Sequence, residues 1–301
     1  MSIVQPKVAL LIPAYNCQEE LNATVRQLPA DEPLHILIVD DGSKPPMQPP
    51  PCDPLHTLEI VRNKVNRKVH GALRRGCAIL AAQGFPYVAR LDAGDFALPG
   101  RFQLQRAFLD AHPDVAIVGS AYHLVENGRE SHHRYSLDDA QIRKLILFRD
   151  QLCHPAVMMR LDAVLAVGNY RDTYPCVEDR DLFVRLLSRF KAANLPEFLT
   201  RKVEHSGSVT VRYRRRMLRS LLRLQIASMR PQCVADWAGV TKTLCHWLLP
   251  HWLFDWLKLR YLQAFEADPE AAPEAMPPAV LRLAATPAGG PHAGPAGNDG
   301  A

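Results

Sequence analysis

Residues 8–16 read VALLIPAYN and decide the fold, because a short apolar run stops at a proline and polar residues follow at once. An apolar run of this length predicts a strand that is buried on both faces. Asn16, with Glu19 three residues on, predicts a helix that begins there with a capping box. A second apolar run over residues 36–39 predicts another buried strand. A strand, a helix and a strand within about 35 residues predict a parallel βαβ unit.

The alternation of strands and helices continues beyond this unit. We expect further strands over residues 58–61, 87–91, 115–118 and 156–159, and helices over residues 69–83, 99–111, 136–149, 178–190 and 212–230. The pattern predicts an α/β fold with a doubly wound, Rossmann-like sheet, whose ligands bind at the carboxyl ends of the strands. Polar clusters follow three of these strands, at residues 13–16, 40–43 and 92–95.

Composition and charge exclude several classes of protein. The chain has 301 residues, of which 48% are hydrophobic and 22% charged, as in ordinary globular proteins. The net charge of +5 is concentrated in residues 201–230. This basic segment has a single aromatic residue, Tyr213, and no nucleic-acid module, so we expect no nucleic-acid partner. The cysteines are odd in number and form no CxxC pair, which argues against a disulfide framework.

The location and the domain organisation follow from similar observations. The first residues lack the basic region and cleavage site of a signal peptide, and no apolar run is long enough to span a bilayer, so we expect a cytoplasmic protein. We predict a catalytic domain over residues 1–210, with halves of about 1–120 and 121–210. A basic, Trp-rich helical extension would occupy residues 211–265. The Ala-, Pro- and Gly-rich residues 266–301 have the composition of a disordered tail.

The familiar phosphate-binding loops are missing from this sequence. No GxGxxG follows the first strand and no GxxxxGK[ST] occurs, so a Rossmann dehydrogenase and a P-loop enzyme are both excluded. Carboxylates can also bind a phosphate, by sharing a metal ion with it. Asp92 and Asp95 flank an Ala-Gly pair after a predicted strand, and Mg²⁺ or Mn²⁺ often bridges carboxylates to substrate phosphates. The alternative is a turn in which both residues only cap the next helix.

Other polar residues are also open to two interpretations. Asp41 fits a turn or a hydrogen bond to a nucleotide, and Tyr15 fits a packed ring or a base-stacking surface. Glu178 and Asp179 begin a predicted helix, where they would cap it or act as a general base. His154, beside an apolar run, is a core residue or a weaker candidate for the site of an acceptor.

Six stretches, taken in order, resemble glycosyltransferase family 2, the GT-A group that uses nucleotide sugars. They are VALLIPAYN (8–16), ILIVDDGS (36–43), RLDAGDFALPGRFQLQRAFL (90–109), HPDVAIVGS (112–120), HPAVMMR (154–160) and VEDRDLFVRL (177–186). The resemblance covers roughly residues 5–210. It is nearest to the bacterial branch that builds exopolysaccharide and lipopolysaccharide, because Pro99, Arg101 and Phe102 follow the aspartate motif as they do there.

The resemblance implies a role for each matching residue. The uracil pocket would be lined by Pro13, Ala14 and Tyr15. Asp41 would contact the base and Asp92 the ribose, with Asp95 nearest to a Mn²⁺ or Mg²⁺ ion and Asp92 also at the metal. Asp179 would be the catalytic base, and Glu178 its neighbour, holding the acceptor.

Two departures from the family pattern bear on these roles. The aspartate motif usually reads Asp-Ala-Asp-Asp, and here Gly94 replaces one carboxylate. The segment around the helix 69–83 is unusually basic, so Lys68 and Arg75 would bind the diphosphate directly or lie on a solvated helix face.

The resemblance implies an inverting glycosyltransferase that moves a sugar, most simply from a UDP-sugar, to a glycan or lipid-linked acceptor of bacterial cell-surface polysaccharide. The alternative, favoured by Gly94 alone, is a catalytically degenerate nucleotide-sugar-binding protein. Residues 205–260 combine arginines with tryptophans, which predicts attachment to an anionic membrane surface on the inner face of the cell membrane. The competing interpretation is that these helices pack on the catalytic domain with their arginines in solvent.

Overall fold

The computed structural model describes residues 6–126, 128–204 and 214–248. The chain divides into two units, Met1–Asp255 and Trp256–Ala301, and every described residue belongs to the first. The strands are β1 (Val8–Ala14), β2 (Leu34–Asp40), β3 (Thr57–Arg62), β4 (Tyr87–Arg90), β5 (Phe96–Ala97), β6 (Val115–Glu126), β7 (Arg129–His133), β8 (Met158–Arg160) and β9 (Lys191–Glu204). The helices are α1 (Gln18–Arg26), α2 (Lys68–Ala82), α3 (Arg101–Ala111), α4 (Asp139–Leu145), α5 (Leu161–Ala166), α6 (Glu178–Leu187), α8 (Arg214–Ser228) and α9 (Val234–Leu248), with a short 3-10 turn at His154–Ala156.

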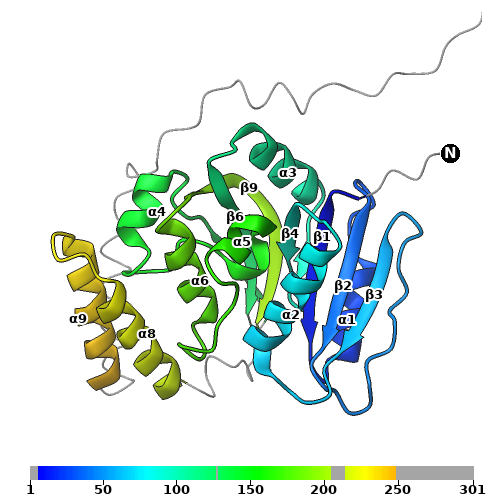
Figure 1. Ribbon diagram of the computed structural model, residues 1–301, viewed down its shortest axis with the longest axis horizontal. Coiled ribbons are helices and arrows are strands. Elements are labelled where there is room, and N and C mark those ends of the chain that lie inside the picture. Colours follow the sequence, from blue (N-terminus) through cyan, green and yellow to red (C-terminus); the bar gives the residue numbers. More distant parts are fainter. Residues whose placement is uncertain (1–5, 127, 205–213, 249–301) are drawn as a thin grey trace, which may run out of the picture. The chain divides into compact units, whose positions relative to one another are not determined.

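The strands form one mixed sheet in the order β3-β2-β1-β4-β8-β6-β9-β5, and β7 pairs with the outer part of β6 (Figure 1). The first four strands of this order are parallel, so the predicted βαβ unit is confirmed. Strand β8 runs antiparallel to both β4 and β6 and joins the two halves of the sheet. The α/β fold class predicted from the sequence is therefore correct.

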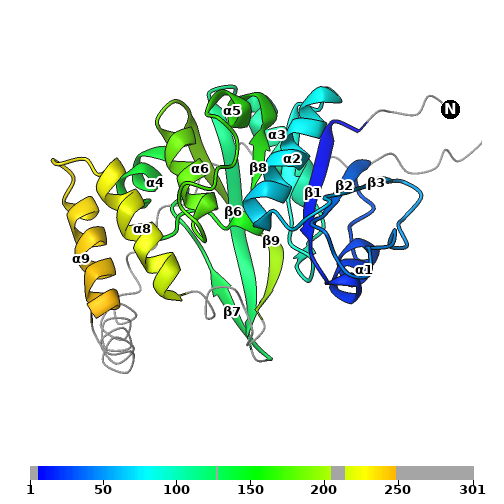
Figure 2. The ribbon, with the colours of Figure 1, turned by 60° about the horizontal axis from the view of Figure 1, so that its bottom comes forward.

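The sheet is buried on both faces because its apolar strands alternate their side chains between two cores. Ala9 and Leu11 of β1 belong to the core under α2, α5 and α6. Val8, Leu10 and Ile12 point the other way, into the core that includes residues of α1 and α3. Figure 2 shows helices on both sides of the central strands. A continuous apolar run is what a strand covered on both faces requires.

Gly76 sets the distance between α2 and the sheet. A Cβ atom at this position would lie 2.3 Å from Cδ1 of Leu11, so the helix approaches β1 more closely than any side chain would allow.

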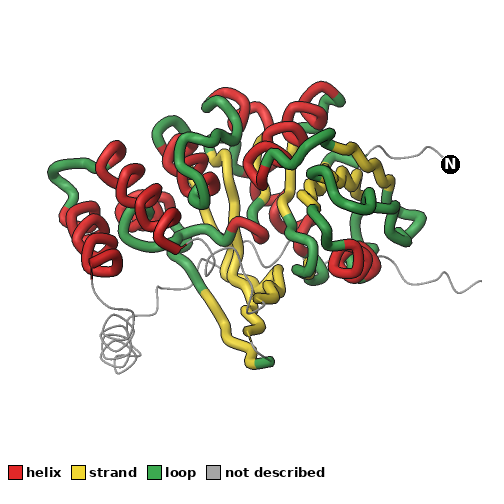
Figure 3. Tube along the Cα trace, turned by 90° about the horizontal axis from the view of Figure 1, so that it is seen from below, coloured by secondary structure: helices red, strands yellow, loops and turns green. Residues whose placement is uncertain are grey.

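The sequence missed several elements. The long strand β9 was not predicted, because Asn194 and Pro196 interrupt its apolar pattern. The strand predicted over residues 115–118 continues to Glu126 and turns back through β7 as a hairpin, which projects from the sheet in Figure 3. The capping box at Asn16 is wrong. Cys17 precedes α1, while the side chain of Asn16 accepts a 2.8 Å hydrogen bond from the backbone N–H of Lys44.

The basic extension begins with two helices, α8 and α9, that contact the segment around α4. Leu218 and Leu224 of α8 are buried, and the side-chain amide of Gln225 donates a 2.7 Å hydrogen bond to the carbonyl of Leu147. This contact agrees with the interpretation that the apolar side of α8 packs on the protein. None of the described helices is long and apolar enough to cross a membrane. Trp252 and Trp256, which the membrane prediction also uses, lie outside the described residues.

Candidate active site

The three polar clusters meet at one edge of the sheet, as the strand register requires. Ala14 pairs with Asp40 across β1 and β2, and Leu11 pairs with Arg90 across β1 and β4. The backbone N–H of Asp41 then donates a 2.8 Å hydrogen bond to the carbonyl of Ala14. The loops that follow β1, β2 and β4 therefore leave the sheet at the same end.

The first of these loops carries the residues predicted to line a base pocket. Pro13 is half-buried and Ala14 is buried, whereas Tyr15 exposes 50% of its surface. The tyrosine ring is therefore available to stack on a planar ligand.

Asp41 is buried and fixes the start of α2. Its carboxylate accepts hydrogen bonds from the side-chain amide of Asn63, at 2.7 Å, and from the backbone N–H of Arg67, at 2.8 and 3.0 Å. Arg75 extends this network, because its guanidinium donates 2.7 Å hydrogen bonds to the Asn63 side chain and to the carbonyl of Arg62. A carboxylate has about four lone-pair sites, so Asp41 keeps capacity for a further donor.

Lys68 is exposed at the first position of α2 and has a backbone φ of 64°. Its backbone N–H donates a 3.1 Å hydrogen bond to the side chain of Asn66. Helix N-termini carry partial positive charge, so a lysine at this position adds to a field that favours anions. The diphosphate role of Lys68 remains a prediction that this geometry favours.

The aspartate motif holds one exposed and one buried carboxylate. The carboxylate of Asp92 is 40% exposed and lies 2.5 Å from the guanidinium of Arg90. Asp95 is only 3% exposed, and one of its oxygens accepts a 2.8 Å hydrogen bond from the backbone N–H of Val203. Burial, reinforced by the charge of Asp92, raises the pKa of Asp95 to about 7. Gly94, between them, has a φ of 98° and donates its N–H to the hydroxyl of Thr24.

The two predicted catalytic acids begin α6 and are only partly accessible. Burial, with help from the charge of Asp179, raises the pKa of Glu178 to about 7. Burial also raises the pKa of Asp179, against the effect of a 2.7 Å hydrogen bond from the backbone N–H of Arg180. A carboxylate with a raised pKa is a stronger base and is better suited to accept a proton from a substrate hydroxyl.

Arg90 joins the aspartate motif to the two predicted catalytic acids, and sequence reasoning missed it. Its guanidinium is almost completely buried, and its positive charge lowers the pKa values of Asp95, Glu178 and Asp179. Burial lowers the pKa of Arg90 itself, but Asp92 outweighs this effect, so the pKa is raised and the guanidinium stays charged. The available signal was a charged residue inside an apolar strand, since a buried charge needs partners.

Strand β9 supplies a second cation that the sequence did not reveal. Lys202 lies 2.5 Å from Glu204, and its charge lowers the pKa values of both Asp95 and Asp179. No motif marks this residue, because its place in the site depends on the pairing of β9 with β5 and β6.

The surroundings of His154 favour its neutral ring. Burial lowers its pKa well below the ordinary value, and the charges of Arg90 and Lys202 lower it further. Its Nε2 lies 2.8 Å from the hydroxyl of Tyr170, and its ring contacts Phe183 edge-on. The structure therefore brings His154 to the site, in a packed and hydrogen-bonded position.

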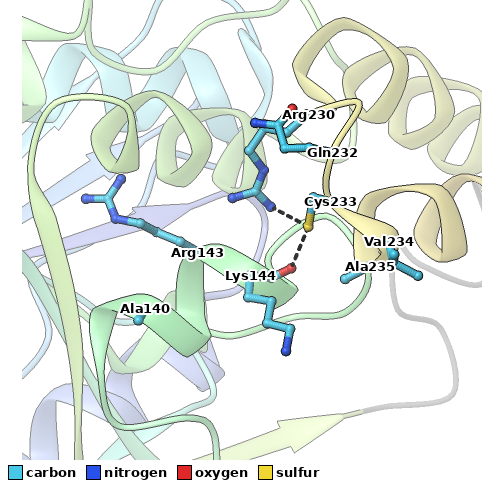
Figure 4. Close-up of a pocket in the computed structure, with 8 residues that line it drawn as sticks. All are labelled: Ala140, Arg143, Lys144, Arg230, Gln232, Cys233, Val234 and Ala235. Carbon is cyan, nitrogen blue, oxygen red and sulfur yellow. Dashed lines mark hydrogen bonds between the residues drawn. The ribbon is translucent and has the colours of Figure 1, made fainter.

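A separate cavity of about 540 Å³ lies between α4 and the turn that joins α8 to α9 (Figure 4). Its arginines already have partners. Arg143 pairs with Asp139, and Arg230 pairs with Asp236 and donates a 3.5 Å hydrogen bond to the sulfur of Cys233. This cavity contains none of the predicted site residues, and it marks a packing seam of the C-terminal helices.

Comparison with known proteins identifies the class to which this fold and site belong. Residues 9–165, just over half of the chain, match the model of the family described as glycosyl transferase family 2. The chain belongs to this family, as its ordered motifs predicted. A relative in Erwinia amylovora, the amylovoran biosynthesis glycosyltransferase AmsE, is 33% identical over 130 residues, which are 42% of this chain and 48% of the relative. The chain therefore matches about half the length of that protein.

Solved structures confirm the GT-A fold. Staphylococcus aureus TarS (residues 1–349) in complex with UDP-GlcNAc gives a TM-score of 0.55 at 14% identity, over 82% of this chain and 73% of TarS. The mannosyltransferase PcManGT of Pyrobaculum calidifontis, in complex with GDP-Man and Mn²⁺, gives 0.53 at 14% identity, over 93% of this chain and 79% of that one. At this identity the likeness establishes the fold.

The carboxylates of the aspartate motif fit a divalent ion that binds together with a diphosphate. Such ions keep several waters and use one or two carboxylates plus substrate phosphates. Asp92 offers an accessible carboxylate. Asp95 has one oxygen bonded to Val203 and the other buried without a hydrogen-bond partner, so it would support the ion from inside the protein.

Proposed function

We propose that this chain is an inverting glycosyltransferase that transfers a sugar from a nucleotide diphosphate, most simply UDP, to a hydroxyl of a glycan or lipid-linked acceptor. One observation carries the proposal. Asp92 and Asp95 at the end of β4 and Glu178 and Asp179 at the start of α6 share a single electrostatic environment, centred on the buried Arg90. This shared environment supports the proposal that a donor-binding motif and a base act on one substrate.

The nucleotide would bind across the three loops at the sheet edge. Pro13, Ala14 and Tyr15 would form one wall of the base pocket, and Asp41 would accept a hydrogen bond from the base. Asp92 would hold the ribose, and the cations Lys68 and Arg75 would face the diphosphate. This arrangement follows the general rule that ligands of open α/β sheets bind at the carboxyl ends of the strands.

The transfer step needs a base on the acceptor side. Asp179 would take the proton of the acceptor hydroxyl while its oxygen attacks the anomeric carbon, and the bond from that carbon to the diphosphate oxygen would break. Glu178 would orient the acceptor. Attack opposite to the leaving group inverts the anomeric centre. Mn²⁺ or Mg²⁺, held by Asp92 with Asp95 behind it, would supply charge neutralisation for the departing diphosphate.

The relatives point to bacterial cell-surface polysaccharide as the product. The name of AmsE refers to amylovoran biosynthesis, and TarS was solved with UDP-GlcNAc. We propose by analogy that the donor is a UDP-sugar, a hexose or an N-acetylhexosamine, and that the acceptor belongs to a surface polysaccharide or lipopolysaccharide.

We further propose that the chain works in the cytoplasm, on the anionic inner face of the cell membrane, through residues 205–260. Three arginines of α8, at positions 215, 219 and 223, are exposed and lie four residues apart, which aligns them along one helix face. Trp237 and Trp247 of α9 expose about half of their surfaces, at 53% and 45%. Arginine and tryptophan together favour a lipid headgroup region.

A ligand screen followed by a turnover assay tests the proposed reaction. The full-length chain is mixed with a set of UDP-, GDP- and dTDP-sugars, and the midpoint of thermal unfolding is measured with Mn²⁺ and with a chelator. The true donor should raise the midpoint, because a ligand at 100 times its Kd stabilises by about 2.7 kcal/mol. The same donor should then be hydrolysed slowly without an acceptor. Donor binding without any hydrolysis or transfer would favour the degenerate binding protein that Gly94 suggests.

A further inference from the structure

Three metal-ligating side chains meet on the β6–β7 hairpin, and none of them has a role in the proposed reaction. His123 and His132 are cross-strand partners, and their Nδ1 atoms lie 2.8 Å apart. Oε1 of Glu130 lies 3.3 Å from Nδ1 of His123. The three ligand atoms all lie within 4.8 Å of one another, and no other group of three or more such side chains occurs in the part of the chain that the structure describes.

Contacts from β9 hold this group in place. The ring of Phe198 stacks on His123 with a centroid distance of 4.5 Å and meets His132 edge-on at 5.6 Å. Arg201 donates a 2.8 Å hydrogen bond to Oε2 of Glu130 and leaves Oε1 beside the histidines. Outer contacts of this kind orient the ligands of metal sites and limit the entropy lost on binding.

The three side chains are arranged almost as the ligands around a bound metal ion are. Two Nδ1 atoms at 2.8 Å share a proton, and a cation in its place would bind both lone pairs. A tetrahedral Zn²⁺ has Zn–N distances of about 2.0–2.1 Å, so its two nitrogens lie about 3.3 Å apart. The rings would therefore separate by about half an ångström. Two imidazoles and one carboxylate suit Zn²⁺ and its neighbours among the transition metals, whereas Mg²⁺ prefers oxygen ligands.

We propose that His123, Glu130 and His132 bind a Zn²⁺-class ion, separate from any metal that accompanies the donor. The fourth position is open to solvent, since Glu130 and His132 are exposed. The ion ties β6 to β7 within the hairpin and, through the hydrogen bond from Arg201 to Glu130, holds the hairpin against β9. Lys202 and Val203, which act on Asp95, follow directly along that strand. Zinc at this site therefore braces the strand that supports the aspartate motif.

The test is a calorimetric titration of the full-length, chelator-treated chain with Zn²⁺ alone. His132→Gln and Glu130→Gln each remove one ligand. His133→Gln is the matched control, because it changes a histidine of the same hairpin whose ring stacks on Tyr122 and lies outside the group. We expect one saturable site in the parent, at least about 10-fold weaker binding in His132→Gln and Glu130→Gln, and binding within twofold of the parent in His133→Gln.

Co²⁺ provides a second measurement that separates this site from the cysteines. A site of two nitrogens and one oxygen should give visible ligand-field bands without a thiolate charge-transfer band, and His132→Gln should abolish them. A parent chain without a saturable Zn²⁺ site, equal affinities of His132→Gln and His133→Gln, or a thiolate band in the Co²⁺ spectrum would each overturn the proposal.

Discussion

The carboxylate of Asp95 accepts a 2.8 Å hydrogen bond from the backbone N–H of Val203, a residue 108 positions further along the chain. The aspartate motif and strand β9 therefore hold each other in place. This contact also explains why Asp95 is buried while Asp92, three residues earlier, remains accessible. The sequence motif does not distinguish the two aspartates, but the structure buries the carboxylate of Asp95 and leaves that of Asp92 accessible.

The first prediction concerns the base. Asp179→Asn should reduce transfer by about 10²–10⁴-fold and leave donor affinity nearly unchanged, because an amide keeps the shape of the carboxylate and cannot take a proton. Initial rates and calorimetric UDP binding check both parts. Asp172→Asn, an exposed change in the loop before α6, is the control and should behave as the parent. A rate for Asp179→Asn within a few-fold of the parent removes this residue from the role of base.

The second prediction is a pH dependence. Since the pKa of Glu178 is raised to about 7, and that of Asp179 is raised as well, the rate should rise with pH and level off above neutrality. Glu178→Gln should move the rise in rate to lower pH, because the like charge next to Asp179 is gone. Transfer rates between about pH 5 and pH 8 measure both effects. A flat profile in the parent contradicts the assignment.

The same raised pKa has a consequence for stability. Between the unfolded value of 4.5 and about 7, the folded chain keeps a proton on Glu178 that the unfolded chain has lost. The contribution of Glu178 to the free energy of unfolding therefore falls as the pH rises through this window. Urea unfolding of the parent and of Glu178→Gln should show a difference that favours the variant increasingly as the pH approaches 7.

The third prediction separates the two aspartates of the motif. Mn²⁺ should strengthen UDP binding to the parent, Asp92→Asn should remove most of this gain, and Asp95→Ala should reduce the affinity in Mn²⁺ far more than in chelator. The reason is that Asp92 offers the accessible carboxylate and Asp95 supports it. Calorimetric titration with UDP in Mn²⁺ and in chelator gives the comparison. Equal UDP affinity of the parent in both buffers would instead assign the diphosphate charge to Lys68 and Arg75.

The fourth prediction restores the carboxylate that Gly94 replaces. Gly94→Asp should increase the dependence of UDP binding on Mn²⁺, since it adds an oxygen ligand between the two aspartates. Its cost in stability should be about 1 kcal/mol, because a residue with a side chain is strained at a φ of 98°. Gly94→Ala is the control for this strain. Its Cβ would lie 3.7 Å from that of Glu20, an ordinary contact, so it should lose stability without any change in the effect of Mn²⁺.

The fifth prediction concerns the membrane. The full-length chain should float with anionic vesicles at low salt, and replacement of Arg215, Arg219 and Arg223 by alanine should abolish flotation, since each basic residue near anionic lipid contributes about 1 kcal/mol. The charge-matched control replaces three exposed arginines elsewhere: Arg26, Arg129 and Arg149. Flotation that persists in the α8 variant, or that is absent in the parent, excludes this helix as the attachment site.

The sequence was sufficient where a short local pattern determines the structure. The apolar runs at residues 8–12, 36–39 and 87–91 predicted three buried strands correctly, and the residues that follow them, Tyr15, Asp41 and Asp92, lie at one edge of the sheet. The outcome for Asn16 was different, because a long-range bond to Lys44 replaced the expected cap. Lys202 reaches the site only through the pairing of distant strands, which no local pattern encodes.

The order of the sheet also has a consequence for how the chain matures. Strand β9, the last strand within the residues that the structure describes, lies between β6 and β5 and carries Val203 to Asp95. A ribosome that has released only residues 1–120 has therefore made every donor-binding loop without the strand that anchors the aspartate motif. The site becomes complete only when β9 has left the exit tunnel, because pairings between distant segments form late in folding. Under the proposed function, a nascent chain would therefore bind a nucleotide sugar fully only after Glu178 and Asp179 have been synthesised.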